Sequence, residues 1–155
     1  MNNPKKQLLN GEWKLIWIEN SVLAQTQKEY TSIAALESSD FSAVSAAVPG
    51  NFEIDLLNAG IIDNPYYSTN ILAMQKFECM HLFYYRRFDV EGLNDPEPYL
   101  HFEGVDTVAD IYINGSLVLS CGNMFIAHEI QLHHLRTYGN EIIVHIKPAV
   151  IEARK

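Results

Sequence analysis

Residues 100–115 read LHFEGVDTVADIYING, and their pattern is typical of two β-strands with a turn between them. Residues 109–113 alternate apolar and polar side chains, as a strand with one buried face requires. Asn114-Gly115 follows, and both residue types tolerate the positive φ of a two-residue hairpin. The apolar run at residues 117–119 then supplies the partner strand.

The same two-residue period recurs along much of the chain. Residues 13–17 and 142–146 alternate in this way, and residues 82–90 are rich in aromatic side chains. Trp13 and Trp17 fall on one strand face. We expect them in the core, with a sugar-stacking platform as the alternative.

Two segments have other patterns. Residues 52–59 have the spacing of a short helix, with Asn51 placed to cap its start and Gly60 to end it. Residues 22–48 are rich in Ser, Ala, Thr and Gln, and predict a short strand or two with a long connection. Residues 92–98 predict a loop. The chain is therefore expected to form an all-β sandwich with one or two short helices.

Composition excludes several classes of protein. The chain has 155 residues and a formal net charge of −8, without the basic cluster that nucleic-acid binding needs. It contains no apolar run long enough to span a membrane. Two cysteines, Cys79 and Cys121, are too few for a disulfide scaffold; we expect two buried thiols, with one bridge as the alternative.

Both ends of the chain bear on location and completeness. The polar start lacks the apolar core of a secretion signal, which favours the cytoplasm, or the periplasm or secretion if a leader was removed. Residues 149–155 follow the last predicted strand and have the character of the opening of a further segment. A sandwich needs its edges paired or covered, so we expect a C-terminally truncated fragment.

Several motifs together resemble one family. Residues 48–67, VPGNFEIDLLNAGIIDNPYY, closely resemble the segment that opens the amino-terminal domain of β-mannosidases. Residues 83–90, FYYRRFDV, and residues 100–115 resemble two further strand motifs, and residues 123–125 and 139–146 follow in the expected order. β-Mannosidases belong to glycoside hydrolase family 2, together with β-galactosidases and β-glucuronidases.

The resemblance, which spans about residues 10–147, implies a galactose-binding-like jelly roll with residues 1–155 as a single domain. In the family, an immunoglobulin-like domain and a TIM barrel follow, and the barrel holds the two catalytic glutamates of a retaining mechanism. A barrel needs ~250 residues, so this chain contains no catalytic residue of that kind. The implied role is that of a non-catalytic sugar-binding and scaffold domain in carbohydrate metabolism. Its partners would be a β-mannoside or β-galactoside and the missing domains.

The best candidate site is the loop at residues 63–70. Tyrosines stack on the apolar faces of sugars, and Asn or Asp side chains bind their hydroxyls. In relatives, an Asn resembling Asn70 touches the sugar. The alternative is a turn fixed by Pro65 whose tyrosines pack on the neighbouring barrel. The candidate substrate-binding residues are Asp63, Asn64, Tyr66, Tyr67 and Asn70.

Three acids lie beside the quoted strand pair. We expect Glu103, Asp106 and Asp110 to be solvent-facing strand-end acids or partners of Arg86 and Arg87, rather than catalytic groups. A salt bridge from one of these arginines to Glu103 or Asp106 is favoured over an interdomain contact.

No metal or other cofactor is expected. The six histidines lack the spacing of zinc ligands, and no dense Asp/Asn loop requires calcium.

Residues 123–127 depart from the family pattern, because Phe125 and Ile126 replace polar residues. We expect these two side chains to pack on apolar surface, either in the core or on a missing domain.

Two other functions fit the same residues. A stand-alone carbohydrate-binding module would present two or three exposed aromatic side chains. The chain offers Tyr66, Tyr67, Tyr84 and Tyr85 for this role, and the sequence does not say which of them are exposed. A self-associating interaction domain would use apolar surface that normally meets the next domain, and would form homo-oligomers.

Overall fold

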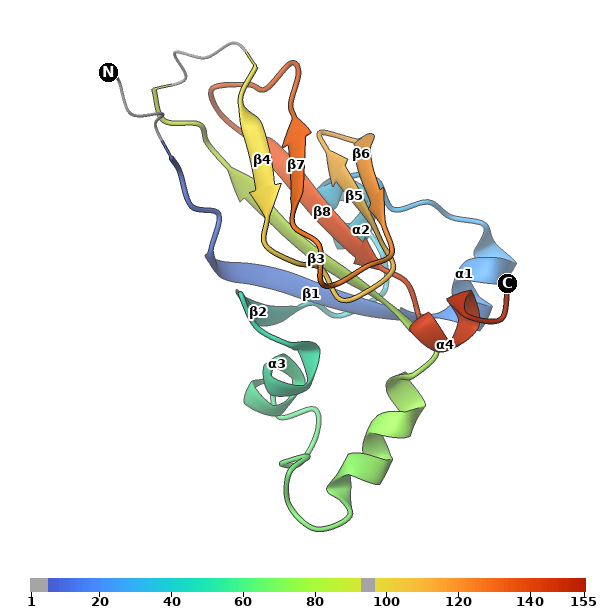
Figure 1. The fold of residues 1–155 in the computed structure, drawn as a ribbon. Coiled ribbons are helices and arrows are strands. Elements are labelled where there is room, and N and C mark those ends of the chain that lie inside the picture. The colour runs from blue at the N-terminus through green and yellow to red at the C-terminus, as the bar shows by residue number, and fades with distance from the viewer. Residues whose placement is uncertain (1–5, 93–96) are drawn as a thin grey trace.

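A computed structural model describes residues 6–92 and 97–155 of the chain (Figure 1). Within these residues it contains eight strands, four α-helices and one 3-10 helix. In chain order they are β1 (Gly11–Glu19), α1 (Asn20–Thr26), α2 (Ile33–Glu37), β2 (Val44–Val48), α3 (Phe52–Asn58), the 3-10 helix η1 (Asn70–Phe77), β3 (Met80–Phe88), β4 (Tyr99–Phe102), β5 (Ala109–Ile113), β6 (Ser116–Cys121), β7 (His128–Gln131), β8 (Asn140–Ile146) and α4 (Ala149–Glu152).

The strands form two antiparallel sheets. The large sheet has the order β2-β1-β3-β8-β5-β6, and β4 pairs with β7 in a small sheet in front of it (Figure 1). Residues such as Leu15, Ile111 and Ile142 are fully buried in the main core, and Leu100 and Ile130 of the small sheet pack against them. The all-β sandwich is therefore confirmed, with more short helices than the one or two expected.

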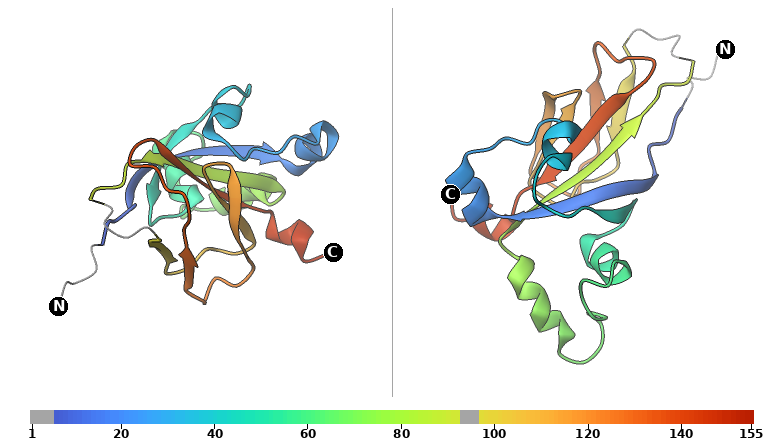
Figure 2. Two further views of the ribbon diagram at one scale, coloured as in Figure 1. Left: turned by 90° about the horizontal axis from the view of Figure 1, so that it is seen from above. Right: turned by 180° about the vertical axis from the view of Figure 1, so that it is seen from behind.

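The outer face of the large sheet has a second core. Figure 2 shows the α1–α2 segment lying over this face. Tyr30, Ile33 and Leu36 from that segment are buried against sheet residues that include Ile16 and Phe83. The prediction of strands in residues 22–48 is thus only partly right, because two helices precede the one strand, β2.

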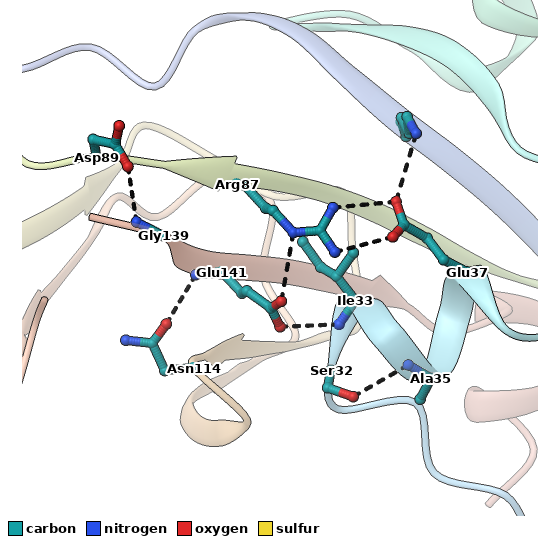
Figure 3. A network of polar contacts seen from close by, with 10 residues as sticks. Ser32, Ile33, Ala35, Glu37, Arg87, Asp89, Asn114, Gly139 and Glu141 are labelled. Carbon is teal, nitrogen blue, oxygen red and sulfur yellow. Dashed lines mark hydrogen bonds and ion pairs between the residues drawn. The ribbon is translucent and has the colours of Figure 1, made fainter.

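Polar contacts hold α2 on the sheet (Figure 3). The Ser32 side chain caps the helix by accepting from the Ala35 N–H at 3.3 Å. The Glu141 carboxylate accepts from the Ile33 N–H at 3.0 Å, and Arg87 lies 3.0 Å from Glu37 and 3.7 Å from Glu141. The hydrogen bond from Arg87 holds the pKa of the Glu37 carboxyl below its usual range.

The expected hairpin turn and the expected core position of the tryptophans are confirmed. Asn114 and Gly115 have φ of 49° and 85° and join β5 to β6 in the predicted hairpin. Trp13 is buried, and Trp17 packs partly buried on the same core. Residues 93–96 of the predicted loop at 92–98 lie outside the described residues.

The two cysteines are both free thiols. Cys121 is buried, and burial raises its pKa. Cys79 is exposed, which corrects the expectation of two buried thiols: it follows η1 at the surface, one residue before β3 begins. None of the helices in the described ranges is long and apolar enough to cross a membrane.

The predicted helix at residues 52–59 is α3. Asn51 caps it, with its side-chain oxygen accepting from the Ile54 N–H at 3.0 Å. The buried Asp55 accepts from the Ala47 N–H at 3.0 Å and from the Tyr84 hydroxyl at 3.3 Å, which ties α3 to β2 and β3.

Replacing the cap should destabilise the chain modestly. We expect Asn51→Ala to lower the free energy of unfolding by about 1 kcal/mol, because the Ile54 N–H loses its acceptor. Equilibrium urea unfolding measures this change. The matched control is Asn58→Ala at the exposed end of the same helix, which should change stability by less than ~0.5 kcal/mol.

Candidate functional site

The candidate loop belongs to a projection from the sandwich. Figure 1 shows α3 and η1 extending below the sheets, away from β4 and β7. We call residues 61–77, between α3 and β3, the arm. Its base is fixed by Phe77, which is buried and makes edge-on contacts with Phe52 and Trp17 at 6.0 and 6.5 Å between ring centroids.

Hydrogen bonds within the loop set its shape. The Asn64 side-chain oxygen accepts from the Tyr66 N–H at 3.0 Å, and the Asn64 carbonyl accepts from the Asn70 side-chain amide at 3.0 Å. Asn64 is therefore a shaping residue of the loop. Tyr66 and Tyr67 are 74% and 73% exposed, so both rings are free to meet a ligand or another surface.

A small pocket of about 150 Å³ lies on the arm. Among the residues that line it are Asp63 and Asn70, which the sequence predicted, and Lys76, which it did not. In a 3-10 helix, side chains three apart eclipse one another, so Asn70, Ala73 and Lys76 form one ridge of η1. A spacing of three would have found Lys76 if a 3-10 helix had been expected there.

The arm also presents apolar surface. Five large apolar side chains on it are between 44% and 74% exposed: Ile61, Tyr66, Tyr67, Ile71 and Leu72. Such a concentration of exposed apolar side chains is typical of a surface that another domain or ligand covers.

Of the three acids beside the strand pair, Glu103 and Asp106 are exposed to solvent, as expected, whereas Asp110 is partly buried and paired. Asp110 lies 2.7 Å from Lys147 and accepts from the Ser120 hydroxyl at 2.6 Å. Burial raises the pKa of Asp110, but these two hydrogen bonds outweigh it and the net pKa is lowered. Asp106 hydrogen-bonds to the neighbouring Thr107 hydroxyl.

Neither arginine makes the predicted salt bridge to Glu103 or Asp106. Arg87 pairs with Glu37 and Glu141 on the outer face, as described above. Arg86 points to the other face and donates to the carbonyls of residues 9 and 10, at 3.0 Å each. The prediction failed because these partners are far away in the sequence or on the backbone.

The aromatic residues offered for a stand-alone module divide into two pairs. Tyr66 and Tyr67 are exposed, whereas Tyr84 and Tyr85 are buried in the two cores, so only the first pair could serve such a module. Burial raises the pKa of both buried tyrosines.

The loop before β7 does not pack on the core of this chain. Phe125 is 87% exposed and Ile126 is 50% exposed, so of the two expected apolar environments the core is excluded. The Asn123 side chain accepts from the Phe125 N–H at 2.9 Å, which shapes the loop.

Among residues 6–92 and 97–155, no group of three or more His, Cys, Asp or Glu side chains could hold a metal ion.

Known proteins resemble both the sequence and the fold. A probable beta-mannosidase of Caenorhabditis elegans is 34% identical over 113 residues, and the beta-mannosidase of Capra hircus is 32% identical over 114 residues. These matches cover 72% and 71% of this chain but only 13% of each relative, so the chain spans about an eighth of their length.

Solved structures agree with these matches. The beta-D-mannosidase of Dictyoglomus thermophilum has a TM-score of 0.74 and 31% identity, over 94% of this chain and 16% of that protein. The beta-glucuronidase of Ruminococcus gnavus, at 17% identity and a TM-score of 0.61, covers 91% of this chain and 21% of its own, and shows the shared fold alone. The family model described as the glycosyl hydrolase 2 galactose-binding domain-like domain matches residues 22–155, and the chain therefore belongs to that family.

Proposed function

We propose that this chain is a non-catalytic sugar-binding and scaffold domain of a β-mannosidase-like glycosidase. The observation that supports the proposal best is the arm, which combines two exposed tyrosines with a pocket lined by Asp63, Asn70 and Lys76. Tyrosine rings stack on the apolar face of a sugar, while carboxylate, amide and ammonium groups bind its hydroxyls. The arm therefore suits contact with a β-mannoside beside a catalytic domain.

The acids of the sandwich do not favour catalysis by this domain. A retaining glycosidase needs two carboxyl groups about 5 Å apart, one of them with a raised pKa. Asp110 is held by Lys147 and Ser120, and its pKa is lowered rather than raised. Asp55 is buried and accepts two hydrogen bonds that fix α3. The isolated chain should therefore leave an aryl β-mannoside intact.

The scaffold role rests on the exposed apolar side chains of the arm. Ile71 and Leu72 on η1 are 53% and 59% exposed, and covering them would remove apolar surface from water. In a longer protein, a neighbouring domain packed on the arm would bring Asp63 and Asn70 to the edge of its substrate pocket.

A chimaera tests both parts of the proposal. The N-terminal domain of the Dictyoglomus thermophilum beta-D-mannosidase is replaced by this chain, and kcat/KM is measured with an aryl β-mannoside. We expect the chimaera to be active and Asn70→Ala to lower its kcat/KM about tenfold, since a lost hydrogen bond to substrate is worth roughly 1.4 kcal/mol. Asn58→Ala, on the exposed end of α3, is the matched control and should change kcat/KM less than about twofold.

The two parts can fail separately. A folded but inactive chimaera would count against the scaffold role. An active chimaera that is indifferent to Asn70→Ala would remove the sugar contact and leave the scaffold role. Turnover by the isolated chain, free of contaminating enzyme, would overturn the non-catalytic assignment.

A further inference from the structure

On the outer face of the large sheet, one row of paired residues is apolar at one end and polar at the other. The strand register aligns Ile16, Phe83, His145, Asp110 and Ser120 across β1, β3, β8, β5 and β6. Directly paired residues of an antiparallel sheet point to the same face. The α1–α2 segment therefore buries the apolar half of the row, and the polar half begins at His145.

A cavity of about 190 Å³ lies where the two halves meet. The Phe83 and His145 rings stack face to face at 4.2 Å between centroids and both line it. Tyr30 and Tyr112 line it as well, and Tyr30 stands edge-on to Phe83 at 5.7 Å. Phe83 and Tyr30 are only 2% and 8% exposed, so the partly exposed rings that line the cavity are those of Tyr112 and His145.

The hydrogen-bond pattern fixes which nitrogen of His145 is free. The Asn20 side-chain oxygen lies 3.0 Å from His81 Nε2, so this nitrogen is the donor and His81 Nδ1 is an acceptor. His81 Nδ1 lies 2.8 Å from His145 Nε2, which must therefore donate. His145 Nδ1 is left as an acceptor, and within the described residues it has no hydrogen-bond partner.

Besides the acceptor on His145, the cavity has the hydroxyl groups of two tyrosines as further hydrogen-bonding groups. Neither the Tyr30 nor the Tyr112 hydroxyl makes a hydrogen bond to any residue that the structure describes. Burial raises the pKa of Tyr112, and the nearby Asp110 and Glu29 carboxylates add to the effect. Tyr112 therefore keeps its proton and can donate a hydrogen bond to a ligand.

The charges around the cavity cancel. Lys28 and Glu29 line it, and the lining carboxylate of Asp110 is neutralised by Lys147 at 2.7 Å. A balanced site of this kind gives no preference to an anion or a cation. Its volume lies below the range of pockets that take drug-sized ligands, so a single small ring fits it.

We propose that the cavity between Tyr30, Tyr112 and the stacked Phe83–His145 pair binds a single neutral pyranose unit. The sugar's apolar face lies on an aromatic ring, and its hydroxyls bond to His145 Nδ1 and the Tyr112 hydroxyl. This site shares no lining residue with the pocket of the arm, so it stands independently of the proposed function.

Nuclear magnetic resonance of the chain tests this proposal. ¹⁵N–¹H spectra are recorded while methyl β-D-mannopyranoside or methyl β-D-galactopyranoside is added to about 50 mM, because one ring in an open pocket binds in the millimolar range. We expect shifts at the amides of Glu29, Tyr112 and His145. Sorbitol, an open-chain polyol without a ring face, should cause none.

Two tyrosine variants serve as a matched pair. Tyr112→Phe removes only the hydroxyl and should weaken binding about tenfold. Tyr138→Phe removes a hydroxyl from a side chain that is 75% exposed and remote from the cavity lining, and should leave the affinity unchanged. Both changes preserve the ring, so dispersed spectra are expected for both variants.

Each other outcome overturns the proposal. Shifts confined to residues 63–76 would assign sugar binding to the arm alone and would support the proposed function instead. Equal shifts with sorbitol would exclude recognition of a ring. An unchanged spectrum with both sugars, or equal affinities of the two tyrosine variants, would exclude a pyranose site in this cavity.

Discussion

Asn140→Ala should lower the free energy of unfolding by about 3 kcal/mol, one of the two largest effects expected for this chain. Asn140 is completely buried at the start of β8. Its side-chain oxygen accepts from the Asn114 amide at 3.0 Å and from the Arg136 N–H at 2.9 Å, and its own amide donates to the Arg136 carbonyl at 2.6 Å.

The size of this effect follows from what the alanine leaves behind. Two donors and one carbonyl lose their partner at once, and a buried polar group without a partner costs about 1–3 kcal/mol. Asn114 also connects the β5–β6 turn to β8, because its oxygen accepts from the Glu141 N–H at 2.8 Å. The substitution thus weakens the turn and the strand together.

Urea unfolding followed by tryptophan fluorescence measures the difference. The matched control is again Asn58→Ala, which removes the same group from an exposed site and should cost less than ~0.5 kcal/mol. A loss below ~1 kcal/mol for Asn140→Ala would mean that water or a shifted turn replaces the missing bonds.

The sequence predicted elements that local chemistry determines. The β5–β6 hairpin follows from alternation and from Asn114-Gly115, and α3 follows from its apolar spacing and the Asn51 cap. Both signals lie within a few residues of the element they specify. The family resemblance then supplied the two-sheet arrangement.

Elements held by distant contacts were missed. α2 has only five residues, and its first N–H bonds to Glu141, 108 residues away. A helix this short depends on tertiary contacts rather than on propensity, so residues 31–38 have no strong helical pattern of their own.

Only part of the candidate site was predicted, because some of its residues come together through contacts that no local pattern shows. Asp63 and Asn70, which the sequence places in one loop, both line the arm pocket. Lys76 lines it too, but only because the three-residue period of η1 puts it on the same ridge as Asn70. The pair of His81 and His145 joins residues 64 positions apart, which no local pattern could indicate. That pair causes the second of the two largest expected effects, the loss of stability at acid pH.

Stability should fall by about 4 kcal/mol between pH 7 and pH 5 because of this histidine pair, about 2 kcal/mol for each imidazole. His81 is buried and bonded to Asn20 and His145. Burial lowers the pKa of His81 to about 4, with Lys147 and Lys155 adding to the shift and Glu152 opposing it. Burial, together with the neighbouring His81, lowers the pKa of His145 to about 3.

The direction follows from which state binds the proton. An unfolded histidine takes a proton near pH 6.5, whereas the folded pair stays neutral until about pH 4. Between these values the unfolded chain binds more protons, so stability is complete above pH 6.5 and falls as the pH drops. Both imidazoles are counted, because in the unfolded chain each takes up its own proton, whereas the folded pair binds almost none above pH 5.

Urea unfolding at a series of pH values from 7.5 to 4.5 measures how the free energy of unfolding depends on pH. A double variant tests whether the histidine pair causes this dependence. His81→Leu/His145→Leu removes both imidazoles and should flatten the profile over this range, whatever its absolute stability. The matched control is His134→Asn, an exposed position with φ of 62° that asparagine tolerates, and it should keep the slope of the unmodified chain.

The carboxylates do not obscure this window. The lowered pKa values of Glu37 and Asp110 start from ordinary values of 4.5 and 3.8, so the stability they contribute is nearly complete down to about pH 5 and is lost below it. A double variant with the same slope as the unmodified chain would show that other groups cause the acid sensitivity. A flat profile for the unmodified chain would show that the folded pair takes up its proton as readily as the unfolded one, which requires water to reach the imidazoles beneath α1.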